Sequence, residues 1–341
     1  MSDFRLLCRE APHRLWRLAF LLLLLPHTFA LAETPALPDK LQLSEWQVPW
    51  GGRPRDPAVD SRGDVWFCGQ SGNYIARFSP RTGTFKKFEI PEGSYPHNLI
   101  VDAENRIWYA GNRNGHIGRL DPATGSIRRF PLPEGVTDPH TLVFDGSGYI
   151  WFTAQNSNRV GRLHMETGAV DLVSAATGKA RPYGIKVDAK GRPWIALFGT
   201  SALAWVDPDK MVLHQVALPR ADARPRRLEI DGEGSIWYVD YPGGYLGRYV
   251  PASGQFTEWR LPGDNPRPYG TAMDTEGRLW LADTGEIPNR ILGFDTDDEV
   301  FFSASEVASG GNVRHMYLSG PENRFWFGVD TGYLAEGRPL E

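Results

Sequence analysis

Beyond residue 40, the sequence consists of short alternations of apolar and polar residues, separated by turns rich in Gly, Asp and Asn. Such alternation is typical of half-buried β-strands, and these turn residues are typical of hairpins. The segments DPHTLVFDGSGYIWFTAQNSNRVGRLHMETGAVDLV and RPYGTAMDTEGRLWLADTGEIPNRILGFDTDDEVFF contain the same succession of apolar alternations. The pattern therefore predicts a repeating unit of four strands.

A tryptophan marks the same position in each unit. These residues are Trp66, Trp108, Trp151, Trp194, Trp237, Trp280 and Trp326. Successive spacings are 42, 43, 43, 43, 43 and 46 residues, and four strands in about 40–45 residues are the signature of a propeller blade. One blade cannot bury both of its faces, so blades stack around an axis. We predict an all-β, seven-bladed β-propeller.

Six units also carry an aspartate six residues before the tryptophan. These residues are Asp60, Asp102, Asp145, Asp188, Asp231 and Asp274. Calcium-binding loops are one interpretation. However, an aspartate in a hairpin ordinarily accepts hydrogen bonds from its own turn, so we favour the structural role.

The two ends of the repeat array predict how the ring closes. Residues 41–48, LQLSEWQV, are similar to the fourth strand of other units, such as FTEWRLP at 256–262. The last unit ends after three strands, near Glu341. We therefore expect the N-terminal strand to complete the seventh blade, within one domain that spans 41–341 and follows a short lead at 33–40.

The first 32 residues have the features of an export signal. Four arginines precede an apolar run at 18–25, and Ala30-Leu31-Ala32 offers a small-x-small cleavage site. The run is shorter than the about 20 residues that cross a bilayer, which disfavours the alternative of a membrane anchor. We predict a signal peptide at 1–32 and a mature protein in the periplasm or outside the cell, with no membrane association after cleavage.

Composition narrows the range of partners. The net charge of −4 argues against nucleic acid, which requires a basic surface. The sequence has no phosphate-cradling glycine loop and no haem-attachment motif. A closed ring exposes few strand edges, so we expect a monomer. Cys68 is the only cysteine beyond the export signal, and its strand pattern predicts a buried apolar residue.

The residue after the proline that opens each unit is never aliphatic. With an equivalent position counted in the last unit, the set comprises Arg55, His97, His140, Tyr183, Arg226, Tyr269 and His315. All seven side chains can donate a hydrogen bond, and packing alone does not explain this choice at seven equivalent positions. We predict that they line a functional mouth of the central channel, and that His116, His164 and His214 lie at the surface.

The repeat phrase resembles that of the virginiamycin B lyase (streptogramin lyase) family. The resemblance rests on PHTLVFDGSGYIWFTAQNSNRVGRL and PHNLIVDAENRIWYAGNRNGHIGRLDPATG, and it covers essentially the whole predicted domain. It implies a propeller that linearises a cyclic depsipeptide by elimination at an ester. In that chemistry, a magnesium ion polarises the ester carbonyl and a histidine removes the neighbouring proton.

Two alignments of the family's site onto this sequence are open. In the first, His97 and His140 match histidines on adjacent blades and Asp138 matches an acid, while Gln155 replaces the acid that ends a strand. In the second, His315 and Asp330 match a histidine and the strand-ending acid, but Tyr269 and Val313 replace their partners. The resemblance thus implies candidate bases His97, His140 and His315, and candidate metal ligands Asp138, Gln155 and Asp330. The candidate substrate-binding residues are Arg55, Tyr183, Arg226 and Tyr269.

Three functions remain open on the sequence alone. The first is a carbon–oxygen lyase acting on a small-molecule or peptide-like ester, and the second is a non-catalytic periplasmic propeller that binds a peptide, glycan or protein. The third is a gluconolactonase-like lactonase that holds its metal with amides such as Asn98, Asn112 and Gln155. Arginines crowd the channel end and would favour an anionic ligand unless strand-ending acids pair with them. The arginines are Arg181, Arg224, Arg227, Arg267 and Arg314, and the acids are Asp240 and Asp283.

Overall fold

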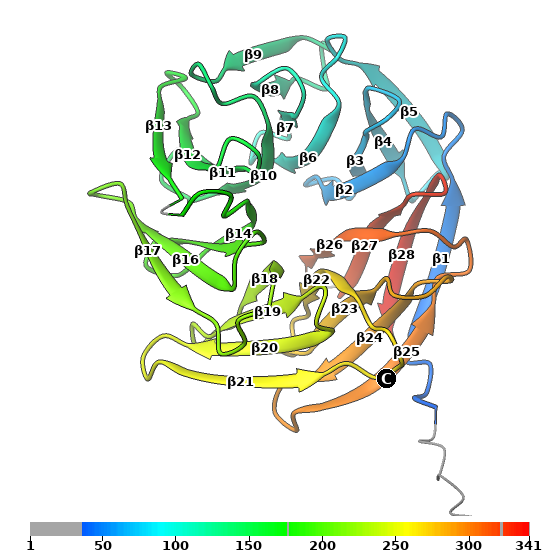
Figure 1. Ribbon diagram of the computed structural model, residues 1–341. Helices are drawn as coiled ribbons and strands as arrows, with labels where there is room; N and C mark the ends of the chain where they lie inside the picture. Colours follow the sequence, from blue (N-terminus) through cyan, green and yellow to red (C-terminus); the bar gives the residue numbers. More distant parts are fainter. Residues whose placement is uncertain (1–35, 176, 321–322, 341) are drawn as a thin grey trace, which may run out of the picture. The chain divides into compact units, whose positions relative to one another are not determined.

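The computed structural model describes residues 36–175, 177–320 and 323–340, in which seven antiparallel four-stranded sheets surround a central channel (Figure 1). The innermost strands are β2 (Pro54–Val59), β6 (Pro96–Val101), β10 (Pro139–Phe144), β14 (Pro182–Val187), β18 (Pro225–Ile230), β22 (Pro268–Met273) and β26 (Val313–Ser319). We number the blades 1 to 7 in this order. The seven-bladed propeller predicted from the sequence is confirmed. The predicted signal peptide at 1–32 lies outside the described residues.

The other strands follow in order from the channel outward. The second strands are β3 (Val65–Gly69), β7 (Ile107–Gly111), β11 (Tyr149–Ala154), β15 (Pro193–Leu197), β19 (Ile236–Asp240), β23 (Leu279–Asp283) and β27 (Arg324–Val329). The third strands are β4 (Tyr74–Ser79), β8 (His116–Leu120), β12 (Arg159–His164), β16 (Ala202–Asp207), β20 (Tyr245–Val250), β24 (Arg290–Asp295) and β28 (Tyr333–Pro339). The outer strands are β5 (Thr84–Glu89), β9 (Ile127–Pro131), β13 (Val170–Ser174), β17 (Val212–Ala217), β21 (Gln255–Arg260), β25 (Val300–Glu306) and β1 (Leu41–Gln47).

Blade 7 is completed by the N-terminal strand, as the sequence predicts. Strand β1 pairs antiparallel with β28, from Leu41 opposite Pro339 to Gln47 opposite Tyr333. In Figure 1 the blue strand β1 lies beside the red strand β28. The segment before β1 is also bonded to blade 6, because the carbonyl of Pro38 accepts a hydrogen bond from the amide of Ala304 at 3.0 Å. This pairing leaves β28 without an open edge.

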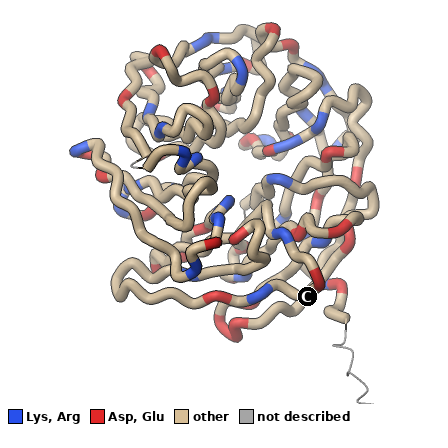
Figure 2. Tube along the Cα trace, in the orientation of Figure 1, with Lys and Arg blue, Asp and Glu red and all other residues tan. Residues whose placement is uncertain are grey.

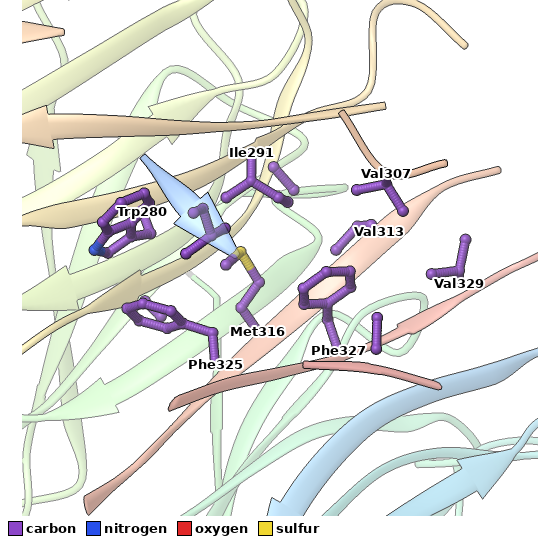
Figure 3. Packing of buried hydrophobic residues seen from close by; sticks show 12 residues of the cluster. Trp280, Ile291, Val307, Val313, Met316, Phe325, Phe327 and Val329 are labelled. Carbon is purple, nitrogen blue, oxygen red and sulfur yellow. The ribbon is translucent and has the colours of Figure 1, made fainter. Parts of the chain in front are cut away.

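The hydrophobic core lies between neighbouring blades. Figure 3 shows one such layer, in which Trp280 and Ile291 of blade 6 pack near Met316, Phe325 and Phe327 of blade 7. All seven repeat tryptophans are buried, each with at most 2% of its surface exposed. Each buried tryptophan removes about 150–250 Å² from water, which is worth about 4–6 kcal/mol at about 25 cal/mol per Å². The repeat is therefore fixed by packing between blades.

The repeated aspartate and tryptophan are joined directly. Asp102 Oδ1 accepts hydrogen bonds from the amides of Glu104 and Arg106, and its Oδ2 accepts one from Trp108 Nε1 at 2.7 Å. The same aspartate–indole bond occurs in blades 1, 4, 5 and 6. In blade 3 the second oxygen of Asp145 bonds Ser147 instead, and Trp151 Nε1 has no partner. The structural role of these aspartates is confirmed, and the bond to the indole is an addition.

Each inner strand contains a β-bulge where it begins. In blade 2, Pro96 lies opposite Gly111 and Leu99 opposite Tyr109, so His97 and Asn98 together face one partner residue. The irregularity occupies the equivalent place in blades 3 to 7 and one residue later in blade 1. Bulges re-aim side chains, and here they bring two consecutive residues of every blade to the channel.

Two single residues complete the comparison with the sequence. Cys68 is buried, as predicted. The surface position predicted for His116 is wrong, because its side chain is fully buried between Asn114 and Tyr109. Burial lowers the pKa of His116 to about 4. Within the described ranges, no helix is long and apolar enough to cross a membrane.

Candidate functional site

Two rings of residues lie at the end of the channel where the inner strands begin, which we call the proline end. The strand registers place in the first ring Arg55, His97, His140, Tyr183, Arg226, Tyr269 and Arg314. The second ring is Asp56, Asn98, Thr141, Gly184, Arg227, Gly270 and His315. The sequence therefore placed six members of the first ring correctly. It misplaced His315 by one residue, because blade 7 opens with Val313 in place of a proline.

The first ring closes the proline end of the channel with its own side chains. The rings of His97 and His140 are in contact, with centroids 3.7 Å apart and a tilt of 38° between their planes, and the ring of Tyr183 lies 4.1 Å from that of His140. The hydroxyl of Tyr183 bonds that of Tyr269 on blade 6. Arg55 is 4% exposed and His140 and Tyr269 are each 2% exposed. These predicted catalytic and substrate-binding residues therefore form one contiguous cluster.

The second ring crosses the channel through Arg227. Its Nη2 donates to Asp56 on blade 1 at 3.2 Å, and its Nη1 donates to Thr141 on blade 3, also at 3.2 Å. Gly184 of blade 4 makes room for this arginine, because a Cβ there would lie 2.8 Å from the carbonyl oxygen of Arg226 and 3.0 Å from Arg227 Cα. Arg227 thus links blade 5 to blades 1 and 3 across the channel.

Asp56 neutralises only part of the charge at this end. It accepts hydrogen bonds from Arg55 at 2.9 Å, Asn98 at 3.0 Å and Arg227 at 3.2 Å, and it is fully buried. Burial alone would raise the pKa of Asp56, but Arg55, His315 and Arg227 outweigh it and hold the pKa below the usual range. One carboxylate between two guanidinium groups leaves a net positive charge. Sequence reasoning missed Asp56, although its place two residues after the opening proline marks it.

The hydrogen bonds assign the tautomer of His97, the first of the two adjacent histidines. His97 Nδ1 lies 3.2 Å from the carbonyl oxygen of His140, so it carries the proton and leaves a lone pair on Nε2. His140 Nδ1 lies 2.9 Å from Thr141 Oγ1, which already accepts from Arg227. Because the threonine hydroxyl has one proton and two lone pairs, this contact is compatible with either tautomer of His140. His97 Nε2 is therefore available as a base.

Both imidazoles are neutral at pH 7. Burial lowers the pKa of His97 well below its ordinary value, and Arg55, His140 and Arg227 lower it further. Burial, Arg227 and Arg55 have the same effect on the pKa of His140. Burial and Arg227 also lower the pKa of His315, to about 3. An anionic ligand would cancel the arginine contribution and make His97 a stronger base.

The two tyrosines differ in acidity because of the arginines around them. The guanidinium carbon of Arg226 lies 3.7 Å from the ring centroid of Tyr269 and 5.1 Å from that of Tyr183. Burial would raise the pKa of Tyr269, but Arg226, Arg55, Arg227 and Arg314 outweigh it and lower the pKa to about 8. Burial and its partner Tyr269 raise the pKa of Tyr183. Tyr269 is therefore the more acidic of the pair.

The carboxylates and amides expected to hold magnesium have other partners. Asp138 accepts hydrogen bonds from the amides of Asn156 and Ser157, at 2.5 and 3.0 Å, and from the Ser157 hydroxyl. Asp330 forms an ion pair with Arg314 at 2.6 Å. The amide of Gln155 faces Arg181, from which its oxygen can accept two hydrogen bonds.

Taken together, these carboxylates and this amide do not fit as ligands of the implied magnesium ion. Among the described residues, no group of three or more His, Cys, Asp or Glu side chains could hold a metal ion. Asp56, Asp138 and Asp330 each already accept hydrogen bonds from other residues of the protein, Asp330 from Arg314. We therefore derive no chemical step through a metal, and magnesium stays a prediction from the resemblance.

The other candidate carboxylates and amides also hold the fold together. Asp240 accepts from the amide of Arg224 at 2.8 Å and pairs with Arg220 at 2.7 Å. Asp283 is bonded in the same way to the amide of Arg267 and to Arg290. The amides that a lactonase would need are likewise used, since Asn98 bonds Asp56 and Asn112 bonds the carbonyl of Pro139.

Four arginines lie just before an opening proline, two residues before the first ring, and we call them the rim arginines. They are Arg53, Arg181, Arg224 and Arg267. Figure 2 shows blue segments around the central opening as well as on the outer surface. Within the described part of the chain, none of the four forms an ion pair with a carboxylate. The rim therefore adds positive charge to an end that is already cationic.

Comparison with known proteins places this geometry in a family. A model described as the virginiamycin B lyase family matches residues 36–291. The chain belongs to this family. His97 and His140 lie inside the matched range of the virginiamycin B lyase family, whereas His315 and Asp330 lie beyond it.

Solved structures share the fold of this family member at low sequence identity. Virginiamycin B lyase from Staphylococcus aureus aligns with a TM-score of 0.79 and 20% identity, covering 88% of this chain and 100% of that chain. A catalytically inactive histidine-to-alanine variant of the same enzyme, with quinupristin, aligns with a TM-score of 0.80 and 20% identity, covering 88% of this chain and 100% of that chain. An extracellular domain assigned to a hybrid two-component system of B. thetaiotaomicron aligns with a TM-score of 0.70 and 14% identity, covering 87% of this chain and 43% of that chain. No curated protein matches the sequence.

Proposed function

We propose that this chain is a carbon–oxygen lyase that opens an ester by elimination, with arginines in the role that the resemblance gives to magnesium. The observation that carries the proposal is the pair of neutral histidines in ring contact, in the same ring as Arg226, which forms no ion pair with a carboxylate of the described residues. His97 Nε2 holds a free lone pair, and the proposal takes the His140 tautomer in which Thr141 donates to Nδ1 and the ring proton lies on Nε2. A base and a donor thus lie side by side, as proton abstraction next to a carbonyl requires.

Each step of the reaction has a group to perform it. His97 Nε2 takes the proton from the carbon next to a carbonyl, whose oxygen is held by His140 Nε2–H. A carbon–carbon double bond forms, the bond to the ester oxygen breaks, and the released carboxylate pairs with Arg226. Arg226 Nε has no hydrogen-bond partner. The proton on His97 is then lost to solvent, and no water is consumed.

Mass spectrometry with quinupristin as probe tests this reaction. Elimination gives a linear product of unchanged mass with a new conjugated double bond, whereas hydrolysis adds one water. Replacing a general base lowers the rate by about 10²–10⁴-fold, so we expect that loss for His97→Gln. The outer-strand change Arg128→Lys serves as control and leaves the rate intact. Absence of any product, or a rate equal to wild type in His97→Gln, contradicts the proposal.

A chelator separates this mechanism from a metal-dependent one. If arginines replace the metal, EDTA leaves the rate unchanged, and Arg226→Lys lowers it because the bidentate contact to the carboxylate is lost. A rate that falls with EDTA and returns with magnesium would show that the metal implied by the resemblance is required.

A non-catalytic binding propeller is the second candidate, and the burial of the first ring favours it. With His140 only 2% exposed, a large ligand at the proline end would contact the rim arginines before the histidines. We expect such a protein to bind an acidic peptide with an affinity that falls as salt rises. Retention of that affinity in a His97→Ala, His140→Ala double variant, together with no turnover, would favour binding over catalysis.

The location and assembly belong to the same proposal. We propose that residues 1–32 are an export signal and that the mature protein is a monomer in the periplasm or outside the cell. Sequencing of the N-terminus after expression checks the cleavage, which we expect after Ala32. A mature protein that retains residues 1–32 would contradict it, and light scattering reports the mass in solution.

A further inference from the structure

A cavity of about 290 Å³ lies in the channel beyond the second ring. Its polar lining at the inner end is Asn98, Thr141, Arg227 and His315. Its walls are apolar and come from several inner strands, with Ile100, Val143, Phe144, Leu228 and Tyr317 among them. A neighbouring cavity shares His315 and Tyr317 and extends to Asp274, at the opposite end of the channel. The His97–His140 stack does not line either cavity.

The inner end of this cavity carries unsatisfied hydrogen-bonding groups. Arg227 is 3% exposed, and its Nε has no partner although both of its Nη atoms are bonded. His315 Nδ1 also has no partner. A buried polar atom without a partner costs about 1–3 kcal/mol, so this pair of nitrogens favours a ligand that supplies oxygen atoms.

The charges around the cavity select the kind of ligand. Lys186 pairs with Glu229 at 2.8 Å, and Thr271 donates to the same carboxylate at 3.1 Å, so these groups balance each other. Arg55 and Arg227 share the single carboxylate Asp56, which leaves one positive charge at the inner end. The site is therefore matched to one negative charge followed by an apolar body.

We propose that this cavity binds a small monocarboxylic acid, with its carboxylate on Arg227 and His315 and its apolar body against Ile100, Val143 and Tyr317. The volume sets the size of the ligand. A cavity of about 150 Å³ holds benzene, so about 290 Å³ accommodates an aromatic or short aliphatic acid. This site lies on the other side of the second ring from the histidines of the proposed lyase, and it does not depend on that function.

Titration calorimetry with benzoate, and with benzyl alcohol as the uncharged counterpart, tests the proposal on the mature protein. We expect saturable binding of one benzoate per chain and no binding of benzyl alcohol. Arg227→Lys removes a planar donor pair and weakens benzoate by about tenfold or more. Arg128→Lys, on an outer strand, is the matched control and leaves the affinity unchanged.

Val143→Phe fills the cavity without removing a charged group, and it keeps the test decisive if Arg227→Lys does not fold. We expect Val143→Phe to abolish benzoate binding while circular dichroism stays that of wild type. Equal binding of benzoate and benzyl alcohol, no binding of benzoate at all, or unchanged affinity in Val143→Phe would each overturn the proposal. The last outcome would place the ligand at the rim arginines instead.

Discussion

The two ends of each inner strand differ in how far their residues repeat between blades and in how many of their polar atoms are hydrogen-bonded. Where the strand ends, an aspartate and a tryptophan recur from blade to blade, and their polar atoms bond each other, as Asp102 and Trp108 do. Where the strand begins, the equivalent positions hold arginine, histidine or tyrosine, and several of their nitrogens have no partner. Arg226 Nε and Arg227 Nε are examples. Apart from Trp151 Nε1 in blade 3, repetition thus accompanies satisfied hydrogen bonding at these positions, and variation between blades accompanies unsatisfied groups.

This contrast shows where a repeat protein can place a site. A residue that recurs in every blade supports packing that every blade needs, so its loss reduces stability. A residue that differs between equivalent positions is free of that requirement and can be selected for chemistry. The following variants test this division, from the largest expected effect to the smallest.

Removing a repeat tryptophan should have the largest effect on stability. Trp108 is fully buried against Phe130, and Trp→Ala substitutions in cores cost about 3–5 kcal/mol. We expect Trp108→Ala to lower the free energy of unfolding by that amount in urea titrations. A loss no larger than that of the outer-strand variant Arg128→Ala would contradict the division between the two ends.

Asp56 is the exception at the proline end, and Asp56→Asn should cost almost as much. It is fully buried between Arg55 and Arg227, and breaking a buried ion pair costs about 3–5 kcal/mol. Since its folded pKa is lowered, its contribution is complete above the unfolded pKa of about 3.9. That contribution is lost as the pH falls through the folded pKa. The difference between wild type and variant in unfolding titrations should therefore shrink below about pH 4 and be constant above it.

Two aspartates of the repeat form a matched pair for a smaller effect. Asp102→Ala removes two bonds to amides, the bond to Trp108 and the ion pair with Arg106, and we expect a loss of about 1–3 kcal/mol. In blade 3, Asp145→Ala removes no indole bond because Trp151 Nε1 already lacks a partner. Thermal unfolding should show a smaller loss for Asp145→Ala. Equal losses would mean that the indole bond and the ion pair with Arg106 together contribute nothing.

The smallest effect on stability is expected for Tyr269→Phe, which instead changes a spectrum. Arginines lower the pKa of Tyr269 to about 8, so its phenolate should appear in near-ultraviolet absorbance two units before ordinary tyrosines. The difference between wild type and Tyr269→Phe should show one titration near that pH. If no such titration is seen, the arginines do not act on Tyr269 as the geometry implies.

The sequence predicts the fold well because the fold depends on repeated local signals. The tryptophan spacing predicts the number of blades, and the resemblance of 41–48 to an outer strand predicts the closure through β1. The ring positions follow from counting after each proline. The count fails only in blade 7, where Val313 opens the strand and Arg314 takes the place expected for His315.

The site is less predictable because it depends on contacts between distant residues. Nothing local shows that Arg227 crosses the channel to Asp56, which is 171 positions away in sequence. Asp138 and Asp330 match the family's acids by position, but their oxygens are taken by Ser157 and Arg314. His116 looked like a surface residue because the pattern does not reveal that Asn114 and Tyr109 surround it.

The pairing of β1 with β28 also determines the order in which the molecule can form. Blades 1 to 6 are each made from one continuous segment, so each can fold as its strands emerge during synthesis. Blade 7 cannot fold in this way, because its outer strand, which contains Leu41, pairs with a strand that contains Pro339 and is synthesised last. Bringing such distant segments together is the entropically costly step, and it makes closure slow. Until then, β1 is an unpaired strand that other chains could capture, so the moment before closure is when this propeller is most exposed to aggregation.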